Sequence, residues 1–333
     1  MDEEAQSRVD VWKYAYGFDT MRVVACVIEL GLPDVLENHG STMTLSQLSS
    51  AVGCPETSLY RILRFLTHNG IFKKLGSSTQ DHVSSVSYAQ TPLSRLLTRD
   101  NMGPFVLLQA GPPGQQFGLS AKDLKAGKGS GLEAAPSENI IWKWEVDEAY
   151  DKLFQEFLAC HARESTRAII DYCPEPFQGI GCLVDVGGHE GTAVGMLVKA
   201  FPWIKAINFD RPEVVSEAPH IDGIEHVGGD MFESVQKLMQ LCSCLCIDIL
   251  KKCKEAVPSG TGKVIIVEAV IDEEGGDEYT GARLAMDMTV MAATINGKER
   301  TAKEWGQLLD AAGFKRHNIK HMKAIESVIE AYP

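Results

Sequence analysis

The chain has 333 residues, of which 44% are hydrophobic and 23% charged, and its formal net charge is −13. This length predicts about two domains, and the composition is typical of a soluble protein with a sizeable core. The acidic balance excludes general binding to nucleic acid or to anionic membranes, which requires a basic surface. The sequence shows neither a membrane-spanning apolar run nor a signal peptide, so we expect a cytoplasmic protein.

The cysteines give no sign of a disulfide or metal framework. Nine cysteines are spread along the chain without paired spacing, which is typical of reduced thiols. Cys242, Cys244 and Cys246 stand close together but lack a second ligand cluster nearby, so we expect no metal site.

The first third of the chain has the pattern of a small helical domain. Apolar residues at helical spacing over residues 5–36 predict one or two helices, broken at Gly31 and Pro33. Residues 42–75 then predict two short helices and a strand, the pattern of a winged helix, with its wing over residues 76–90. Only Arg61 and Arg64 are basic in the second helix, so we expect this part to serve packing and dimerisation rather than DNA binding.

After a helical stretch over residues 138–172, the pattern changes. Strands predicted at 182–186, 206–209 and 262–269 alternate with helices at 192–200, 247–256 and 302–312. This alternation is typical of a parallel sheet with helices on both faces. The fold class is therefore α/β: a mostly helical winged-helix dimerisation domain over residues 1–170, followed by a Rossmann-like domain over residues 171–333.

A glycine-rich loop follows the first predicted strand of the second domain. Asp185 closes the strand, and Gly187, Gly188 and Gly191 allow the backbone to approach a nucleotide-type ligand without a Cβ between them. His189 and Glu190 stand in the same loop, where they add bulk and negative charge. The loop predicts a cofactor site whose affinity these two residues reduce.

Acidic residues also close the second predicted strand and stand where a third strand should end, at Asp230. Asp210 closes the second strand, where a carboxylate commonly accepts both ribose hydroxyls. Asp230 is followed by Met231 and Phe232. There an acid can accept from an adenine amino group, while a methionine can lie against the ring.

These motifs make the chain resemble the plant small-molecule O-methyltransferases that use S-adenosylmethionine. The resemblance covers nearly the whole length and rests on Val184-Asp-Val-Gly-Gly, Gly229-Asp-Met-Phe, Ile249-Leu-Lys-Lys-Cys-Lys-Glu-Ala-Val-Pro, Lys263-Val-Ile-Ile-Val-Glu, Gly297-Lys-Glu-Arg-Thr and Ser327-Val-Ile-Glu-Ala-Tyr-Pro. It implies S-adenosylmethionine as cofactor and methyl transfer to a phenolic hydroxyl of an alkaloid or phenylpropanoid. It also implies a homodimer, or a heterodimer with a related methyltransferase, and no nucleic-acid or membrane partner.

The resemblance implies two catalytic acids but leaves the catalytic base unmatched. In such enzymes a histidine in a His-Asp-Trp motif removes the phenolic proton, and two acids orient it; Glu268 and Glu299 match those acids. This chain has no histidine between His226 and His317. We therefore expect impaired activity.

The segment that replaces the expected motif suggests an origin for the loss. Codons for Pro-Lys-Ala-Asp-Ala-Val-Met-Leu, read one nucleotide out of register, can give Gln-Lys-Leu-Met-Gln-Leu-Cys-Ser, which is residues 236–243. We interpret this as a frame slip or splice change that rewrote the fourth strand. Residues 238–245 are apolar enough to form a substitute buried strand.

The resemblance also implies the residues that face the acceptor. They are Phe154, Leu158, His161, Met288 and Met291. Relatives carry a methionine and an aspartate where this chain has Leu158 and His161, so His161 is a weak candidate for a substitute base. A catalytically inactive dimer partner and a winged-helix regulator remain the alternative functions.

Overall fold

The computed structural model describes residues 2–76, 86–111, 148–230, 243–258, 260–293 and 297–333. The chain forms two compact units, called here the N-terminal and the C-terminal unit. The boundary between them falls between Cys160 and His161, inside the long helix α10 (Glu148–Tyr172). The boundary predicted after residue 170 lies in the same helix.

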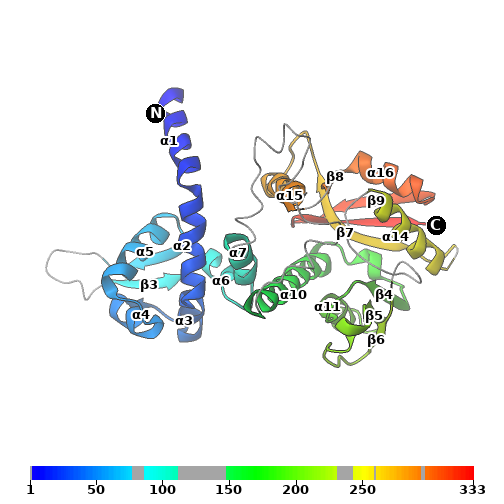
Figure 1. Ribbon diagram of the computed structural model, residues 1–333, viewed down its shortest axis with the longest axis horizontal. Helices are drawn as coiled ribbons and strands as arrows, with labels where there is room; N and C mark the ends of the chain where they lie inside the picture. Colours follow the sequence, from blue (N-terminus) through cyan, green and yellow to red (C-terminus); the bar gives the residue numbers. More distant parts are fainter. Residues whose placement is uncertain (1, 77–85, 112–147, 231–242, 259, 294–296) are drawn as a thin grey trace. The chain divides into compact units, whose positions relative to one another are not determined.

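The N-terminal unit is mostly helical and contains a short sheet. Its helices are α1 (Glu3–Ala15), α2 (Gly17–Glu29), α3 (Leu32–His39), α4 (Leu45–Val52), α5 (Glu56–His68), α6 (Pro92–Leu96) and α7 (Gly103–Ala110). Its strands β1 (Met43–Thr44), β2 (Phe72–Leu75) and β3 (Ser87–Gln90) pair antiparallel in the order β1-β3-β2. Figure 1 shows this sheet beside α4 and α5, the arrangement of a winged helix.

Helical apolar spacing explains the core of this unit. Leu59, Leu63 and Leu66 occupy one face of α5 and are fully buried. The predicted helix break at Gly31 is present, because Gly31 has a φ of 70° at the start of α3. The first stretch forms three helices rather than one or two, because the backbone also leaves helical geometry at Tyr16.

The C-terminal unit alternates strands and helices. Its strands are β4 (Cys182–Val186), β5 (Lys205–Asp210), β6 (Ile224–Gly228), β7 (Val264–Ile271), β8 (Arg300–Thr301), β9 (Arg316–His321) and β10 (Glu326–Tyr332). Its helices are α11 (Thr192–Ala200), α12 (Pro212–Val215), α14 (Ser243–Ala256), α15 (Thr280–Ala293), α16 (Ala302–Ala311) and the second half of α10, with a short 3-10 turn at Glu175–Phe177.

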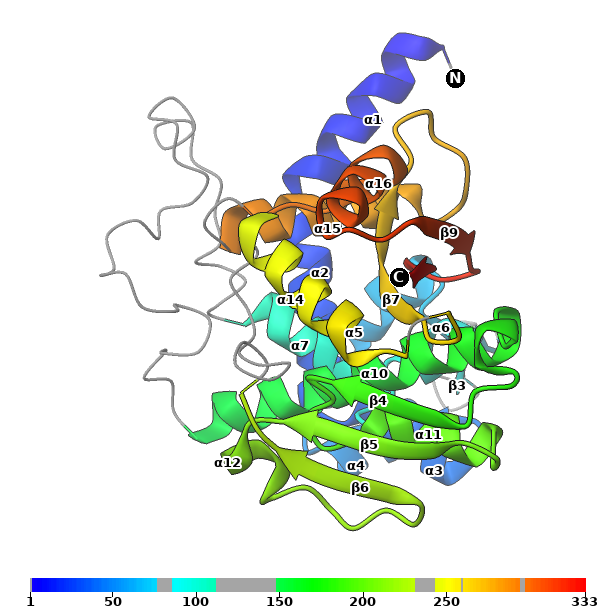
Figure 2. The same ribbon diagram turned by 90° about the vertical axis from the view of Figure 1, so that its right-hand side faces the viewer.

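These strands form two sheets where the sequence predicted one parallel sheet. β4, β5 and β6 pair in parallel, as predicted, and lie side by side in Figure 2. In the second sheet, of order β8-β7-β10-β9, β10 runs antiparallel to both β7 and β9. The short link from His321 to Glu326 explains the antiparallel β9–β10 pair, because a parallel pair needs a long crossover.

Helices cover both faces of the second sheet. Ile265 and Val267 of β7 and Val328 of β10 pack in a cluster with residues of α10 and α11. Ile266 and Ile329, which lie opposite each other on the two strands, pack with α14 and α16 instead. This alternation along the strands gives a three-layer C-terminal unit.

Strand β4 marks the place where the two sheets separate. Among the described residues it pairs with β5 alone, and Val184 on it is 48% exposed. The substitute strand predicted over residues 238–245 is wrong for residues 243–245, because these begin helix α14. Residues 238–242 lie outside the described residues.

Candidate functional site

The glycine loop connects β4 to α11 as the sequence predicted. Gly187 and Gly191 have φ angles of 77° and 85°, in the left-handed region that favours glycine. The Gly187 N–H donates to the carbonyl of Phe209 over 2.8 Å, which ties the loop to the end of β5. The Gly191 N–H donates to the carbonyl of Gly188 over 2.8 Å, and α11 begins directly afterwards.

Gly188 is required by packing inside the protein. A Cβ at this position would lie 2.1 Å from Oδ1 of Asn208 and 2.6 Å from Oδ2 of Asp185. Asn208 is fully buried, and its amide nitrogen is 2.8 Å from the carbonyl of His189 and 3.0 Å from Nδ1 of His226. The loop therefore packs on two side chains of neighbouring strands.

Asp210 holds the loop through its carboxylate. Its Oδ2 accepts from the N–H of His189 over 2.9 Å, and its Oδ1 accepts from the N–H of Arg211 over 2.7 Å. His189 adopts a φ of 53°, which is costly for a residue with a side chain. Its imidazole is partly buried, while Glu190 is exposed.

The residues of this loop fit the predicted S-adenosylmethionine. A carboxylate has about four acceptor positions, so Asp210 can accept from ribose hydroxyls while it keeps both backbone bonds. Asp185 adds a buried Oδ2 without a hydrogen-bond partner among the described residues, and burial, followed by the charge of Asp210, raises the pKa of Asp185 to about 6. Asp230 is partly exposed after β6, whereas Met231 and Phe232 lie outside the described residues.

The two predicted catalytic acids form an acidic cluster in the C-terminal unit. Burial, followed by the charges of Glu268 and Asp287, raises the pKa of Glu299 to about 7. Burial also raises the pKa of Glu268. Asp287 accepts the backbone N–H of Glu299 over 2.8 Å, so α15 fixes the position of this acid. The two glutamates thus lie close enough for the charge of Glu268 to raise the pKa of Glu299.

A histidine faces this cluster from α10. Nε2 of His161 lies 2.9 Å from Oε1 of Glu326 on β10. The hydrogen bond with Glu326 raises the pKa of His161, burial opposes it, and the charges of Glu268 and Glu299 add to the rise. Burial alone would raise the pKa of Glu326, but the hydrogen bond and charge of His161 lower it.

Glu326 and the residues that hold it were not predicted from the sequence. Ser165 donates to Oε1 of Glu326 over 2.8 Å, and Glu326 is 7% exposed. The signal in the sequence was an acid directly before the shared motif that begins at Ser327. Only the β10 pairing shows that this acid faces α10.

Buried Arg283 of α15 supports the chain just before Glu326. Its guanidinium donates to the carbonyls of Ala324 and Ile325 over 2.9 and 2.7 Å, and both oxygens of Asp277 accept from it over 2.9 Å. The charge of the buried arginine is thus paired with Asp277, and its three nitrogens all donate hydrogen bonds.

The predicted acceptor-facing residues belong to different units. Phe154 and Leu158 are partly buried in the N-terminal unit, where the ring of Phe157 lies 5.9 Å from Phe154 and 5.3 Å from Phe105. Met288, which is exposed, and Met291, which is partly buried, belong to α15 of the C-terminal unit. Their role toward an acceptor stays a prediction.

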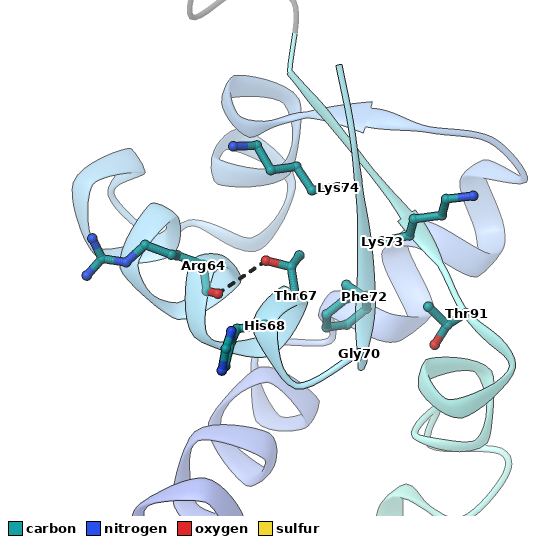
Figure 3. Close-up of a pocket in the computed structure, with 8 residues that line it drawn as sticks. All are labelled: Arg64, Thr67, His68, Gly70, Phe72, Lys73, Lys74 and Thr91. Carbon is teal, nitrogen blue, oxygen red and sulfur yellow. Dashed lines mark hydrogen bonds between the residues drawn. The ribbon is translucent and has the colours of Figure 1, made fainter. Parts of the chain in front are cut away.

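A basic surface hollow lies on the winged helix. It measures about 510 Å³ and is lined by Arg64, Thr67, His68, Gly70, Phe72, Lys73, Lys74 and Thr91. Figure 3 shows that the cationic ends of Lys73 and Lys74 point in opposite directions and that Arg64 points away from Thr91. Because these cations diverge, the hollow does not converge on a single phosphate.

Neither a membrane span nor a metal cluster is present in the described part of the chain. Each helix there is too short or too polar to span a bilayer. Within the same residues, no group of three or more His, Cys, Asp or Glu side chains could hold a metal ion.

Comparisons with known proteins place these features in one family. An O-methyltransferase domain matches residues 137–315, and an O-methyltransferase dimerisation domain matches residues 12–100. The chain is 47% identical to flavonoid 7-O-methyltransferase 2 of Ocimum basilicum and 48% identical to flavonoid 4'-O-methyltransferase 4 of Mentha piperita, in each case over 100% of this chain and 99% of the relative. It is 36% identical to 3'-hydroxy-N-methyl-(S)-coclaurine 4'-O-methyltransferase 1 of Papaver somniferum, over 99% of this chain and 97% of that protein.

Solved structures share the fold. Human N-acetylserotonin methyltransferase in complex with SAM has a TM-score of 0.80 at 19% identity, covering 100% of this chain and 98% of that chain. A methyltransferase of calicheamicin biosynthesis in its SAH-bound form has a TM-score of 0.79 at 21% identity, covering 100% and 99%. With the glycine loop, the paired acids and both matched domains in place, the chain belongs to the O-methyltransferase family.

Proposed function

We propose that this protein transfers a methyl group from S-adenosylmethionine to a phenolic hydroxyl of a flavonoid-type acceptor. The observation that carries the proposal is the full-length similarity to plant flavonoid O-methyltransferases, combined with a glycine loop fixed by Asp210. The alkaloid O-methyltransferase at 36% identity supports the wider class of plant phenols as acceptors.

The loop residues would hold the cofactor. Asp210 would accept the ribose hydroxyls, Asp185, Gly187, Gly188 and Gly191 would form the wall beside it, and Asp230 with Met231 and Phe232 would take the adenine. Bound S-adenosylmethionine supplies a methyl group on a positively charged sulfur, which is electrophilic. The acidic residues of the loop suit this positive charge.

The acid cluster would act on the acceptor. A phenol has a pKa of about 10, so its oxygen attacks readily only when a base removes the proton. Glu268 and Glu299 would orient that base. With no histidine between His226 and His317, and with His189 strained in the loop, we expect slower transfer than in relatives that carry the His-Asp-Trp motif.

The dimerisation domain supports assembly of two chains. We expect a homodimer. A heterodimer with a related methyltransferase is the alternative assembly.

Two measurements test the proposal in sequence. Calorimetric titration with S-adenosylhomocysteine measures cofactor binding without any acceptor, and micromolar affinity is expected. Methyl-labelled S-adenosylmethionine and a flavone with free 7- and 4'-hydroxyls then report transfer. Absence of labelled product from a folded protein that binds S-adenosylhomocysteine, across a panel of flavonoids and alkaloid phenols, would contradict the proposal.

A further inference from the structure

We propose that His161, held by Glu326, is the general base of methyl transfer in this chain. The proposal rests on the proposed function. It assigns to α10 a role that the resemblance assigns to a histidine of another segment, and this sequence has no histidine between His226 and His317.

The pair has the geometry of a base and its orienting acid. Nε2 of His161 lies 2.9 Å from Oε1 of Glu326. The side chain of His161 is 41% exposed while that of Glu326 is 9% exposed, so the acid is fixed inside and the imidazole faces outward. A carboxylate on one ring nitrogen sets the tautomer and stabilises the imidazolium that forms when the other nitrogen takes a proton.

Glu326 is itself held from two sides. Ser165, one turn further along α10, donates to the same Oε1 over 2.8 Å. Arg283 donates to the carbonyls of the two preceding residues, so the start of β10 cannot shift without breaking hydrogen bonds to a buried arginine. Such support reduces the entropy lost on reaching a reactive geometry.

The acids that act on His161 include the two glutamates that correspond to the base-orienting acids of the related O-methyltransferases. Glu326 on β10, Glu268 on β7 and Glu299 before β8 each raise the pKa of His161. All three glutamates favour the imidazolium. The acid pair expected to flank the missing histidine therefore acts electrostatically on a histidine from a different element.

Atoms and electrons balance in the proposed step. The O–H bond of the phenol breaks and its proton moves to Nδ1 of His161, while Nε2–H donates to Glu326. A lone pair of the phenol oxygen forms the new O–CH₃ bond, and the electron pair of the broken C–S bond stays on sulfur, which yields S-adenosylhomocysteine. The imidazolium later releases its proton to solvent.

The alternative is that the ion pair only ties α10 to β10. Both roles predict that loss of His161 lowers activity, so the rate at a single pH cannot separate them. A base, unlike a tie, gives the rate a pH dependence that follows the ionisation of that histidine.

The test uses the full-length protein with methyl-labelled S-adenosylmethionine and a flavone with free 7- and 4'-hydroxyls, from pH 6 to 10. In the wild type, kcat should rise as His161 loses its proton and then level off. His161→Gln should lower kcat about 100-fold, at the low end of general-base effects. It should also remove the rise of kcat with pH, called here the limb. Glu326→Gln should move the limb to lower pH, because the carboxylate that raises the histidine pKa is gone.

Controls separate catalysis from folding. His321→Gln changes an exposed histidine at the end of β9, whose Nδ1 lies 3.1 Å from Oγ of Ser327, and should keep the wild-type profile. Binding of S-adenosylhomocysteine shows that each variant is folded. Proton NMR titration of the His161 ring in the wild type gives its pKa without any substitution, and that value should match the limb.

The outcomes distinguish the two proposals. Two results would overturn the role of His161 and leave the proposed function standing. One is a His161→Gln variant with the wild-type kcat and an unchanged limb. The other is an NMR pKa of His161 that differs from the midpoint of the limb. No transfer by a wild-type protein that binds S-adenosylhomocysteine overturns both.

Discussion

The backbone N–H of His189 donates to Oδ2 of Asp210 over 2.9 Å, and His189 is the described non-glycine residue with a positive φ, at 53°. The carboxylate predicted to take the ribose therefore also stabilises a strained loop. Because the strain arises at a Cβ, its cost can be separated from the effect of the imidazole.

His189→Gly and His189→Ala together measure this strain. The Gly variant should be more stable than the Ala variant by about 1 kcal/mol, since the left-handed conformation penalises a Cβ by roughly that amount. Both should bind S-adenosylhomocysteine more tightly than the wild type, because both remove the imidazole from the loop. Chemical denaturation and calorimetric titration check the two expectations. Equal stability of the two variants would show that the bond to Asp210 has relaxed the loop.

Gly188→Ala should destabilise the C-terminal unit. The new Cβ would meet Oδ1 of Asn208 at 2.1 Å and Oδ2 of Asp185 at 2.6 Å, and overpacking of this kind costs about 1–3 kcal/mol. Gly281→Ala is the matched control, because Gly281 lies at an exposed position of α15 and a Cβ there would meet nothing within 4 Å. That substitution should change the stability by less than about 0.5 kcal/mol, as exposed substitutions usually do. A neutral Gly188→Ala would mean that the two side chains can move apart.

Glu299→Gln should stabilise the protein in a pH-dependent way. The pKa of Glu299 is raised from 4.5 to about 7, so folding disfavours its ionised form. Wild-type stability from this group therefore falls as pH rises from about 4.5 to 7, and is constant above. Glu299→Gln should gain about 1–3 kcal/mol at pH 8 and little at pH 4.5.

Denaturation of both proteins between pH 4.5 and 8.5 checks this expectation. Glu273→Gln removes a negative charge from an exposed site and serves as the control for the acidic net charge. A gain of the same size in both variants would attribute the effect to net charge rather than to the acid cluster.

Val184→Thr tests the edge of β4. Val184 is 48% exposed, so this change should cost less than about 0.5 kcal/mol, as surface substitutions usually do. Val194→Ala on α11, where Val194 is fully buried, should cost about 1–3 kcal/mol. Thermal and chemical unfolding give both values. A large loss for Val184→Thr would show that part of the chain outside the described residues covers this edge.

Local sequence patterns determined many of the elements of this protein. Residues 182–186 and 192–200 form the predicted strand and helix with the predicted bounds, and the winged-helix elements follow in order. Apolar periodicity and glycine act over a few residues, so a linear sequence carries their effect directly. Glu268 and Glu299 were identified through motif resemblance, and their role in catalysis stays a prediction.

Contacts between distant segments were decided by the tertiary structure alone. Ser165 and Glu326 are 161 positions apart, and their hydrogen bond exists because β10 turns back antiparallel beside β7. The same strand gives His161 its carboxylate partner, Glu326. The sequence by itself determined the family, the loop and the acids. Which histidine faces those acids depended on long-range strand pairing, which no local pattern of residues encodes.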